Sequence, residues 1–446
     1  MVRRVLIANR GEIAVRVIRA CRELDLETVA VYSEADTDSL HVKLADEAVA
    51  IGPPPALRSY LNIPRLIQAA VDTGSDAVHP GYGFLSENPA FAQVCEAMGI
   101  AFVGPSSATL RLLGDKIAAR EVAARAGVPV VPGSSHPLAS LEEACGLARR
   151  LGYPVLLKAL AGGGGRGIRL VRDEDGLRRR WELAAQEARS AFGSPELYLE
   201  KYLEQPRHIE VQVLADSYGS MVHLGERDCS LQRRRQKVLE ECPSPALDES
   251  MRRTLARAAL RIMRAARYRG AGTVEFLVTG GACYFLEVNA RIQVEHPVTE
   301  MVWGVDLVQE QLRIAAGERL RFGQAALRPR GWALEMRICA EDPDQDFLPC
   351  PGSLTAYRPP GGPGVRVDDG VYPGWTIPPH YDSLLAKLTV WGQDRREAVA
   401  RARRALHEYV VEGVRTTIPL HLRLLDDPVF SRGEAGTTYL DRGADP

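Results

Sequence analysis

Glu287, Asn289 and Arg291 follow one another at two-residue intervals in an apolar segment of this 446-residue chain. In a strand, that spacing places a carboxylate, an amide and a guanidinium on one face. An earlier apolar segment, residues 273–278, carries Glu275 and predicts a partner strand. The two segments together predict a hairpin with acidic and amide groups side by side.

The loop between these predicted strands decides whether Glu275 and Glu287 meet. A three-residue loop over residues 280–282 would set them opposite each other, whereas a two-residue loop would put them on opposite faces. We predict the three-residue loop. Adjacent carboxylates repel each other unless a cation lies between them, and oxygen ligands suit Mg²⁺ that bridges nucleotide phosphates. A solvated pair is the alternative, which the apolar strands disfavour.

Four consecutive glycines, residues 162–165, follow a predicted strand over 154–158 that ends in Lys158. Glycines leave backbone N–H groups unobstructed, so they can surround phosphate oxygens. No G-K-[ST] sequence follows, which excludes a Walker P-loop. A flexible surface loop is the alternative, but Lys158 and Arg166 on either side favour a mobile phosphate lid.

Glu295 directly follows the predicted metal-binding strand and its arginine, Arg291. A carboxylate placed there could act as a general base, although a structural ion pair explains it equally well. The basic stretch over 228–237 contains too few aromatic residues for single-stranded nucleic acid. It favours a small anionic substrate over a solvated basic face.

Lysine is scarce in this chain, since only six of the 56 basic residues are lysines: Lys43, Lys116, Lys158, Lys201, Lys237 and Lys387. A compact ammonium and a planar guanidinium are different ligands, so a retained lysine indicates a position that arginine cannot fill. A random remainder is the alternative interpretation.

Strand and helix patterns alternate over the first part of the chain and predict a doubly wound, mostly parallel sheet. The first turn, residues 9–12, lacks the G-x-G-x-x-G dinucleotide pattern. The fold class is α/β, or α+β overall. We predict three domains: residues 1–114, residues 115–330 with a lid at about 131–203, and residues 331–446.

Composition excludes several classes of protein. A net charge of −1 creates no field for nucleic acid or an anionic membrane, and the N-terminus resembles neither a signal peptide nor a membrane span. Eight cysteines without a C-x-x-C pair argue against disulfides and zinc and fit a cytoplasmic protein. Single histidines such as His79 and His296 lack metal-ligand spacing.

These motifs together resemble biotin carboxylase of the ATP-grasp superfamily, over essentially the whole chain. The segments that carry the resemblance are residues 7–14, 79–88, 158–167, 200–203, 232–237 and 287–300, with Glu275. The resemblance implies an ATP-grasp fold with a glycine-rich lid between the doubly wound domain and a mixed C-terminal domain.

The resemblance also implies a set of site residues. ATP would be bound by Lys116, Lys158, Gly163, Gly164, Gly165, Glu200, Lys201, Leu203, His208, Gln232, Arg235, Glu275 and Glu287. Two Mg²⁺ or Mn²⁺ ions would be held by Glu275, Glu287 and Asn289. Bicarbonate would be bound by Lys237, Arg291, Gln293, Val294 and Glu295, and biotin by Tyr82 and Arg337. The catalytic residues would be Glu295, Arg291, Arg337 and Lys237.

The implied reaction is carboxylation of biotin through carboxyphosphate. No lysine lies in a Met-Lys-Met-like segment, so we expect biotin to arrive on a separate carrier protein. The expected partners are that carrier, carboxyltransferase subunits and a second copy of the chain, within acetyl-CoA carboxylase. Alternatives are another acyl-CoA or pyruvate carboxylase, another bicarbonate-using ATP-grasp ligase such as a carbamoyl-phosphate-forming enzyme, and an inactive nucleotide-binding regulator. Arg235 replaces the usual histidine of the family near the nucleotide sugar.

Overall fold

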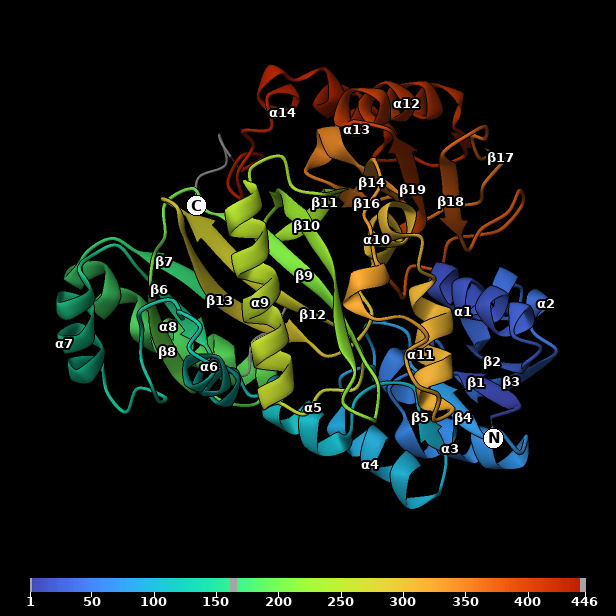
Figure 1. The fold of residues 1–446 in the computed structure, drawn as a ribbon, viewed down its shortest axis with the longest axis horizontal. Helices are drawn as coiled ribbons and strands as arrows, with labels where there is room; N and C mark the ends of the chain where they lie inside the picture. Colours follow the sequence, from blue (N-terminus) through green and yellow to red (C-terminus); the bar gives the residue numbers. More distant parts are fainter. Residues whose placement is uncertain (1, 161–166, 442–446) are drawn as a thin grey trace.

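A parallel five-stranded sheet forms the N-terminal part of the protein, whose computed structural model describes residues 2–160 and 167–441. Its strand order is β3 (Glu47–Gly52), β2 (Glu27–Ser33), β1 (Arg4–Ile7), β4 (Ala77–His79) and β5 (Ala101–Phe102). The helices are α1 (Gly11–Glu23), α2 (Leu40–Leu44), α3 (Ile63–Asp72), α4 (Pro89–Ala97) and α5 (Ser107–Gly114). The predicted parallel sheet is therefore confirmed (Figure 1).

The turn between β1 and α1 brings two distant segments together. Gly11 starts α1 with a φ of +63°, a conformation that glycine adopts without a Cβ clash. The side-chain amide of Asn9 donates to the carbonyls of Pro80 and Tyr82 at 2.7 Å each. This tie holds Tyr82 beside the first turn of α1.

A small antiparallel sheet lies within the region predicted as the lid. Its order is β7 (Ile168–Val171), β6 (Val155–Ala159) and β8 (Leu197–Lys201). Helices α7 (Leu141–Leu151) and α8 (Glu174–Phe192) pack against it around a separate apolar core, and α6 (Lys116–Arg125) precedes it. The predicted phosphate-binding glycines Gly163, Gly164 and Gly165 lie outside the described residues.

The central sheet has eight antiparallel strands and carries seven of the predicted site residues. Their order is β13 (Ala282–Asn289), β12 (Gly270–Thr279), β9 (Arg207–Ala215), β10 (Met221–Arg233), β11 (Gln236–Cys242), β14 (Trp332–Cys339), β19 (Leu384–Gly392) and β18 (Val365–Asp369). Helices α9 (Glu249–Ala265), α10 (His296–Trp303) and α11 (Leu307–Ala315) belong to the same region. Because β11 pairs with β14, one sheet continues across the predicted boundary at residue 330.

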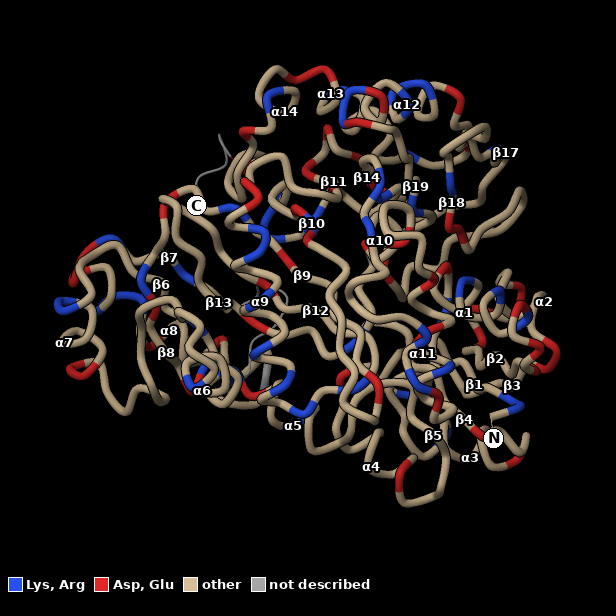
Figure 2. The backbone as a smooth tube through the Cα atoms, in the orientation of Figure 1, with Lys and Arg blue, Asp and Glu red and all other residues tan. Residues whose placement is uncertain are grey.

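The C-terminal region completes the molecule beside the N-terminal sheet (Figure 1). Its helices are α12 (Arg395–Glu408), α13 (Ile418–Asp426) and α14 (Pro428–Ser431), and its short strands are β15 (Glu341–Asp342), β16 (Leu348–Pro349), β17 (Ala356–Arg358) and β20 (Val410–Glu412). Acidic and basic residues are interspersed along the chain (Figure 2). Among the described residues, no helix combines the length and apolar character needed to cross a membrane.

Candidate active site

One cavity of about 2480 Å³ receives every predicted site residue that the structure describes. The loop after β4 contributes Tyr82, the small sheet contributes Lys158 and Glu200, and strands of the central sheet contribute seven others. Its other predicted residues are Lys116, Lys201, Leu203, His208, Gln232, Arg235, Lys237, Glu275, Glu287, Asn289, Arg291, Gln293, Val294, Glu295 and Arg337. Residues up to 255 positions apart therefore share one space, from Tyr82 to Arg337.

Glu275 and Glu287 are directly paired across the β12–β13 hairpin, as predicted, although the predicted loop is wrong. The strands are joined by two residues, Gly280 and Gly281, with Thr279 paired to Ala282. A register shift after Glu275 corrects the alignment. Such a β-bulge adds one residue to one strand, so it brings the two carboxylates to opposing positions despite the shorter loop.

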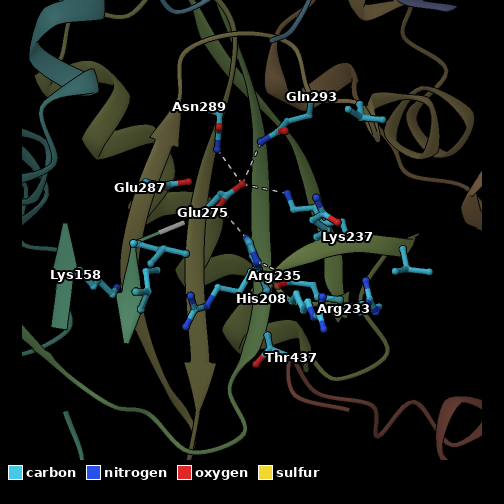
Figure 3. A pocket seen from close by; sticks show the side chains of 18 of the residues that line it. Lys158, His208, Arg233, Arg235, Lys237, Glu275, Glu287, Asn289, Gln293 and Thr437 are labelled. Atoms are coloured by element: carbon cyan, nitrogen blue, oxygen red, sulfur yellow. Dashed lines mark hydrogen bonds and ion pairs between the residues drawn. The ribbon is translucent and has the colours of Figure 1, made fainter. Parts of the chain in front are cut away.

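Glu275 is already surrounded by donors (Figure 3). Its Oε1 accepts from Asn289 at 2.9 Å, and from Gln293 and Lys237 at 3.1 Å each. Its Oε2 lies 2.9 Å from Nε2 of His208. Burial raises the pKa of Glu275, but Lys237 and His208 outweigh that effect and hold the pKa far below its usual range. The carboxylate is thus ionised in the absence of a metal ion.

Glu287 has the opposite electrostatic setting. Burial and the neighbouring charge of Glu275 raise the pKa of Glu287, and Lys116 only partly offsets them. A divalent cation between the two carboxylates would relieve this repulsion, which is why the pair fits Mg²⁺. The side-chain amide of Asn289 donates a hydrogen bond to Glu275 and so fixes the orientation of that carboxylate.

Glu295 is fully buried and lies between two cations. Its Oε1 is 2.6 Å from Nζ of Lys237, and its Oε2 is 2.9 Å from Nη2 of Arg337. Burial would raise its pKa, but attraction to Lys237, Arg337 and Arg227 keeps the pKa well below the usual value. The predicted base is thus unprotonated, and its neighbouring cations lower its basicity.

Arg337 is shared between two carboxylates, Glu240 on β11 and Glu295 in the turn that precedes α10. Its Nε donates to Glu240 on β11 at 2.7 Å, beside its contact with Glu295. Burial and repulsion by Glu295 raise the pKa of Glu240 to about 7, although Arg337 opposes the shift. Oε2 of Glu240 is buried and accepts no hydrogen bond from the described residues.

The remaining predicted cations differ in where their charged groups point. Nζ of Lys158 forms a buried ion pair with Glu200, which also accepts from Arg120 at 2.6 Å. Lys201 lines the cavity, but its ammonium donates to the carbonyls of Gly152 and Tyr153 at 2.8 and 3.3 Å. The ammonium of Lys201 therefore caps carbonyl groups at the C-terminal end of α7.

Arg235 occupies a tight turn. Arg234 and Arg235 are the two residues between β10 and β11, with φ values of +47° and +65°. Two-residue hairpin loops with both φ values positive favour glycine, asparagine or aspartate, so two arginines are uncommon here. The arrangement directs residue 235 into the cavity, on the side of Arg233 and Thr437 (Figure 3).

Several residues that complete the site were not predicted from the sequence. Glu210 on β9 is fully buried and contacts Lys237 at 2.6 Å. Arg227 forms a buried ion pair with Glu210 and donates to Gln212 at 2.8 Å and Thr299 at 2.9 Å. Glu210 could have been predicted as a site residue because it is a charged residue within the apolar pattern of β9. Glu240 had a similar signal beside the apolar residues of β11.

Comparison with known proteins agrees with this geometry. Three family descriptions match the chain in succession: "Biotin carboxylase, N-terminal domain" over residues 1–110, "Carbamoyl-phosphate synthase L chain, ATP binding domain" over 115–322, and "Biotin carboxylase C-terminal domain" over 335–442. Biotin carboxylase 1 of Bacillus subtilis is 55% identical over 443 residues, which cover 99% of this chain and 98% of that protein. The chain belongs to the biotin carboxylase family.

Solved structures of the family have the same fold. The biotin carboxylase domain dimer of Hydrogenobacter thermophilus 2-oxoglutarate carboxylase, in complex with MgADP, ADP and bicarbonate, superposes with a TM-score of 0.96. It is 51% identical, with 99% of this chain and 98% of that chain covered. A pyruvate carboxylase subunit from Methanothermobacter thermautotrophicus is 52% identical, with 100% of this chain and 91% of that protein covered. Relatives thus serve carboxylases with different final substrates.

Proposed function

We propose that this biotin carboxylase family member carboxylates biotin presented by a separate carrier protein, using ATP and bicarbonate. The observation that carries the proposal is the chain of contacts from Glu275 through Lys237 to Glu295 and Arg337. It joins the predicted metal and nucleotide groups to the predicted bicarbonate base and biotin residue within one cavity. Relatives crystallised with MgADP and bicarbonate support the same substrates.

The proposed reaction begins with bicarbonate. Glu295 would accept the bicarbonate proton, while Lys237 and Arg291 would hold the anion in position for attack on the γ-phosphate. Glu275 and Glu287 would hold Mg²⁺, which supplies neutralisation of phosphate charge when bound. Phosphoryl transfer depends mainly on positioning and electrostatic stabilisation, which these fixed cations can provide.

The low pKa of Glu295 requires that substrate binding changes its surroundings. Lys237 and Arg337 now contact its two oxygens at 2.6 and 2.9 Å. Bicarbonate and the phosphates are anions, so they would compete for Lys237 and weaken its hold on Glu295. Its pKa would then rise toward that of a working base. The base would become effective when its substrate is present.

Biotin would be carboxylated in the second step, near Arg337 and Tyr82. Carboxyphosphate would release CO₂ and phosphate, the phosphate would take the ureido N–H proton of biotin, and the ureido nitrogen would then form a bond to the carbon of CO₂. Arg337 would stabilise the resulting enolate-like oxygen, because its guanidinium always carries charge. The carrier protein and carboxyltransferase subunits are the proposed partners, with a homodimer as the assembly and acetyl-CoA carboxylase as the proposed complex.

Steady-state kinetics would test this function. We expect ADP release that requires bicarbonate and Mg²⁺ and rises with biotin, and incorporation of ¹⁴C-bicarbonate into biotin. Bicarbonate-dependent ADP release that ignores biotin would indicate a different bicarbonate-using ligase. Absence of both activities, with ATP still bound, would indicate a nucleotide-binding regulator and contradict the proposal.

A further inference from the structure

Lys387 is fully buried next to the active site, although no predicted role accounts for it. It lies on β19, and its Nζ is 3.1 Å from Oε2 of Glu12 and donates to the carbonyl of Val294 at 3.0 Å. It is one of only six lysines in an arginine-rich chain. A single compact ammonium therefore contacts the N-terminal helix α1 and the loop that carries Glu295.

The contact with Val294 acts on the peptide next to the predicted base. The carbonyl of Val294 and the N–H of Glu295 belong to one planar peptide group, so fixing the carbonyl fixes the orientation of both. A hydrogen bond from a charged donor is stronger than one between neutral groups. Lys387 thus fixes the orientation of the peptide group that joins Val294 to Glu295. Val294 itself lines the cavity.

The contact with Glu12 acts on the biotin side of the cavity. Oε1 of Glu12 accepts a hydrogen bond from the hydroxyl of Tyr82, while Oε2 faces Lys387. The ring of Tyr82 also lies 5.9 Å from Nζ of Lys387. Two opposite oxygens of one carboxylate therefore connect the lysine to the predicted biotin-binding tyrosine.

Stability alone does not account for this buried pair. Burying two charges costs desolvation energy that their attraction often fails to recover, and apolar residues of the same size can be equally stable. Lys387 is also aligned with Arg337 on β14, a second cation, and with Asp368 on β18. Placing a lysine beside an arginine here has a cost, which favours a role in geometry.

We propose that Lys387 and Glu12 are a positioning pair that holds the bicarbonate loop and Tyr82 at a set separation. The proposal rests on the proposed function and extends it. When carboxyphosphate forms near Glu295, biotin must already be in place, since a displacement of about 1 Å can cost 10²-fold in rate. The pair is a rigid link between the two half-sites, formed by segments from both ends of the chain.

A double substitution separates positioning from folding. Lys387→Met alone leaves the buried carboxylate of Glu12 without its neighbouring cation and is expected to lower Tm. Lys387→Met combined with Glu12→Gln removes both charges and keeps similar shapes, so Tm should return close to that of the unmodified protein. The matched control is Arg252→Met with Glu226→Gln, a partly buried pair at 2.7 Å outside the cavity.

The measurements are Tm, KM for bicarbonate, KM for ATP, and the ratio of carboxybiotin to ADP formed. In the Lys387/Glu12 double variant we expect KM for bicarbonate to rise about tenfold and the ratio to fall, because the charged hydrogen bond to Val294 is lost. KM for ATP should stay within about twofold, because the pair contacts Val294 and Tyr82, which are predicted to bind bicarbonate and biotin and not the nucleotide. Glu12→Gln alone should keep KM for bicarbonate and lower only the ratio.

Restored Tm together with unchanged KM for bicarbonate and an unchanged ratio would overturn the proposal, because the pair would then be only a structural tie. Equal changes in the Arg252/Glu226 control would overturn it as well. Failure of the proposed function is distinguishable, since the unmodified protein would then show no bicarbonate-dependent ADP release at all.

Discussion

Nζ of Lys237 lies 2.6 Å from Oε1 of Glu295 and, at the same time, 3.1 Å from Oε1 of Glu275. One ammonium group therefore bridges the predicted base and a predicted metal ligand. Oε2 of Glu210 also lies 2.6 Å from Nζ of Lys237. Bicarbonate that binds at Lys237 would consequently meet both the group that removes its proton and the site of the nucleotide phosphates.

The two halves of the reaction should respond differently to substitution. Glu295→Gln keeps the shape of the side chain but removes the base, and loss of a general base costs about 10²–10⁴-fold. We expect ADP release and carboxybiotin formation to fall together. Arg337→Ala should preserve much of the bicarbonate-dependent ADP release and lower carboxybiotin steeply, because carboxyphosphate can still form and decay.

The ratio of carboxybiotin to ADP measures this division, with ¹⁴C-bicarbonate and a coupled ADP assay. Glu249→Gln, on an exposed position of α9, is the matched control and should behave as the unmodified protein. Equal loss of ADP release in both variants, at an unchanged ratio, would assign Arg337 to the bicarbonate site.

Glu240 should make stability depend on pH. Its pKa is raised to about 7, above the usual 4.5, so the folded protein holds a proton that the unfolded chain releases. Stability from this group therefore falls as pH rises from about 4.5 to about 7. Glu240→Gln removes that dependence. We expect the free energy of unfolding of the variant, relative to that of the unmodified protein, to increase between pH 5 and pH 8 by about 1–3 kcal/mol. The difference in Tm between the two proteins should increase with it.

Thermal unfolding in buffers matched for ionic strength would check this change. The exposed Glu249→Gln serves again as control, since its Tm difference should be independent of pH. A Tm difference for Glu240→Gln that stays constant from pH 5 to pH 8 would show that Glu240 is already ionised in the folded protein over this range.

Glu287 should set the requirement for Mg²⁺. Burial and Glu275 raise its pKa, so a proton competes with the metal ion as pH falls. Glu287→Gln removes one charged ligand, and we expect the Mg²⁺ concentration for half-maximal ADP release to rise about tenfold or more. In the unmodified protein the Mg²⁺ concentration for half-maximal ADP release should increase as pH falls. In Glu287→Gln this increase should disappear. Retention of the pH dependence in Glu287→Gln would exclude Glu287 as its source.

Arg235→His should act mainly on nucleotide binding. Residue 235 lines the cavity from the β10–β11 turn, and the resemblance places it near the nucleotide sugar. We expect KM for ATP to change more than kcat, because the transferred phosphoryl group lies elsewhere. Arg234→His, one position earlier in the same turn, is the control for effects on the turn itself. A fall in kcat at constant KM for ATP would contradict the assignment.

The sequence predicted the parallel sheet because it depends on local patterns, whereas the predicted pairing of Glu275 with Glu287 is reached through a two-residue loop and a β-bulge. The loop prediction was wrong because a β-bulge is decided by tertiary packing, and nothing in the strand alternation marks it. Glu210 and Glu240 were missed since a buried acid in a strand becomes a site residue only through its neighbours. The scarcity of lysine pointed to Lys387, but the contact with Glu12 joins positions 375 residues apart.

The pairing of β11 with β14 has a practical consequence for anyone who divides this protein. Leu239, Glu240, Glu241 and Cys242 hydrogen-bond along strand β14, which begins after the predicted boundary at residue 330. Expression of the first 330 residues alone would leave β11 as an open strand edge, which favours intermolecular pairing and aggregation. The predicted boundary at residue 330 is thus unsuitable as a cloning boundary, and a fragment that ends there would need a replacement for the missing strand to remain monodisperse.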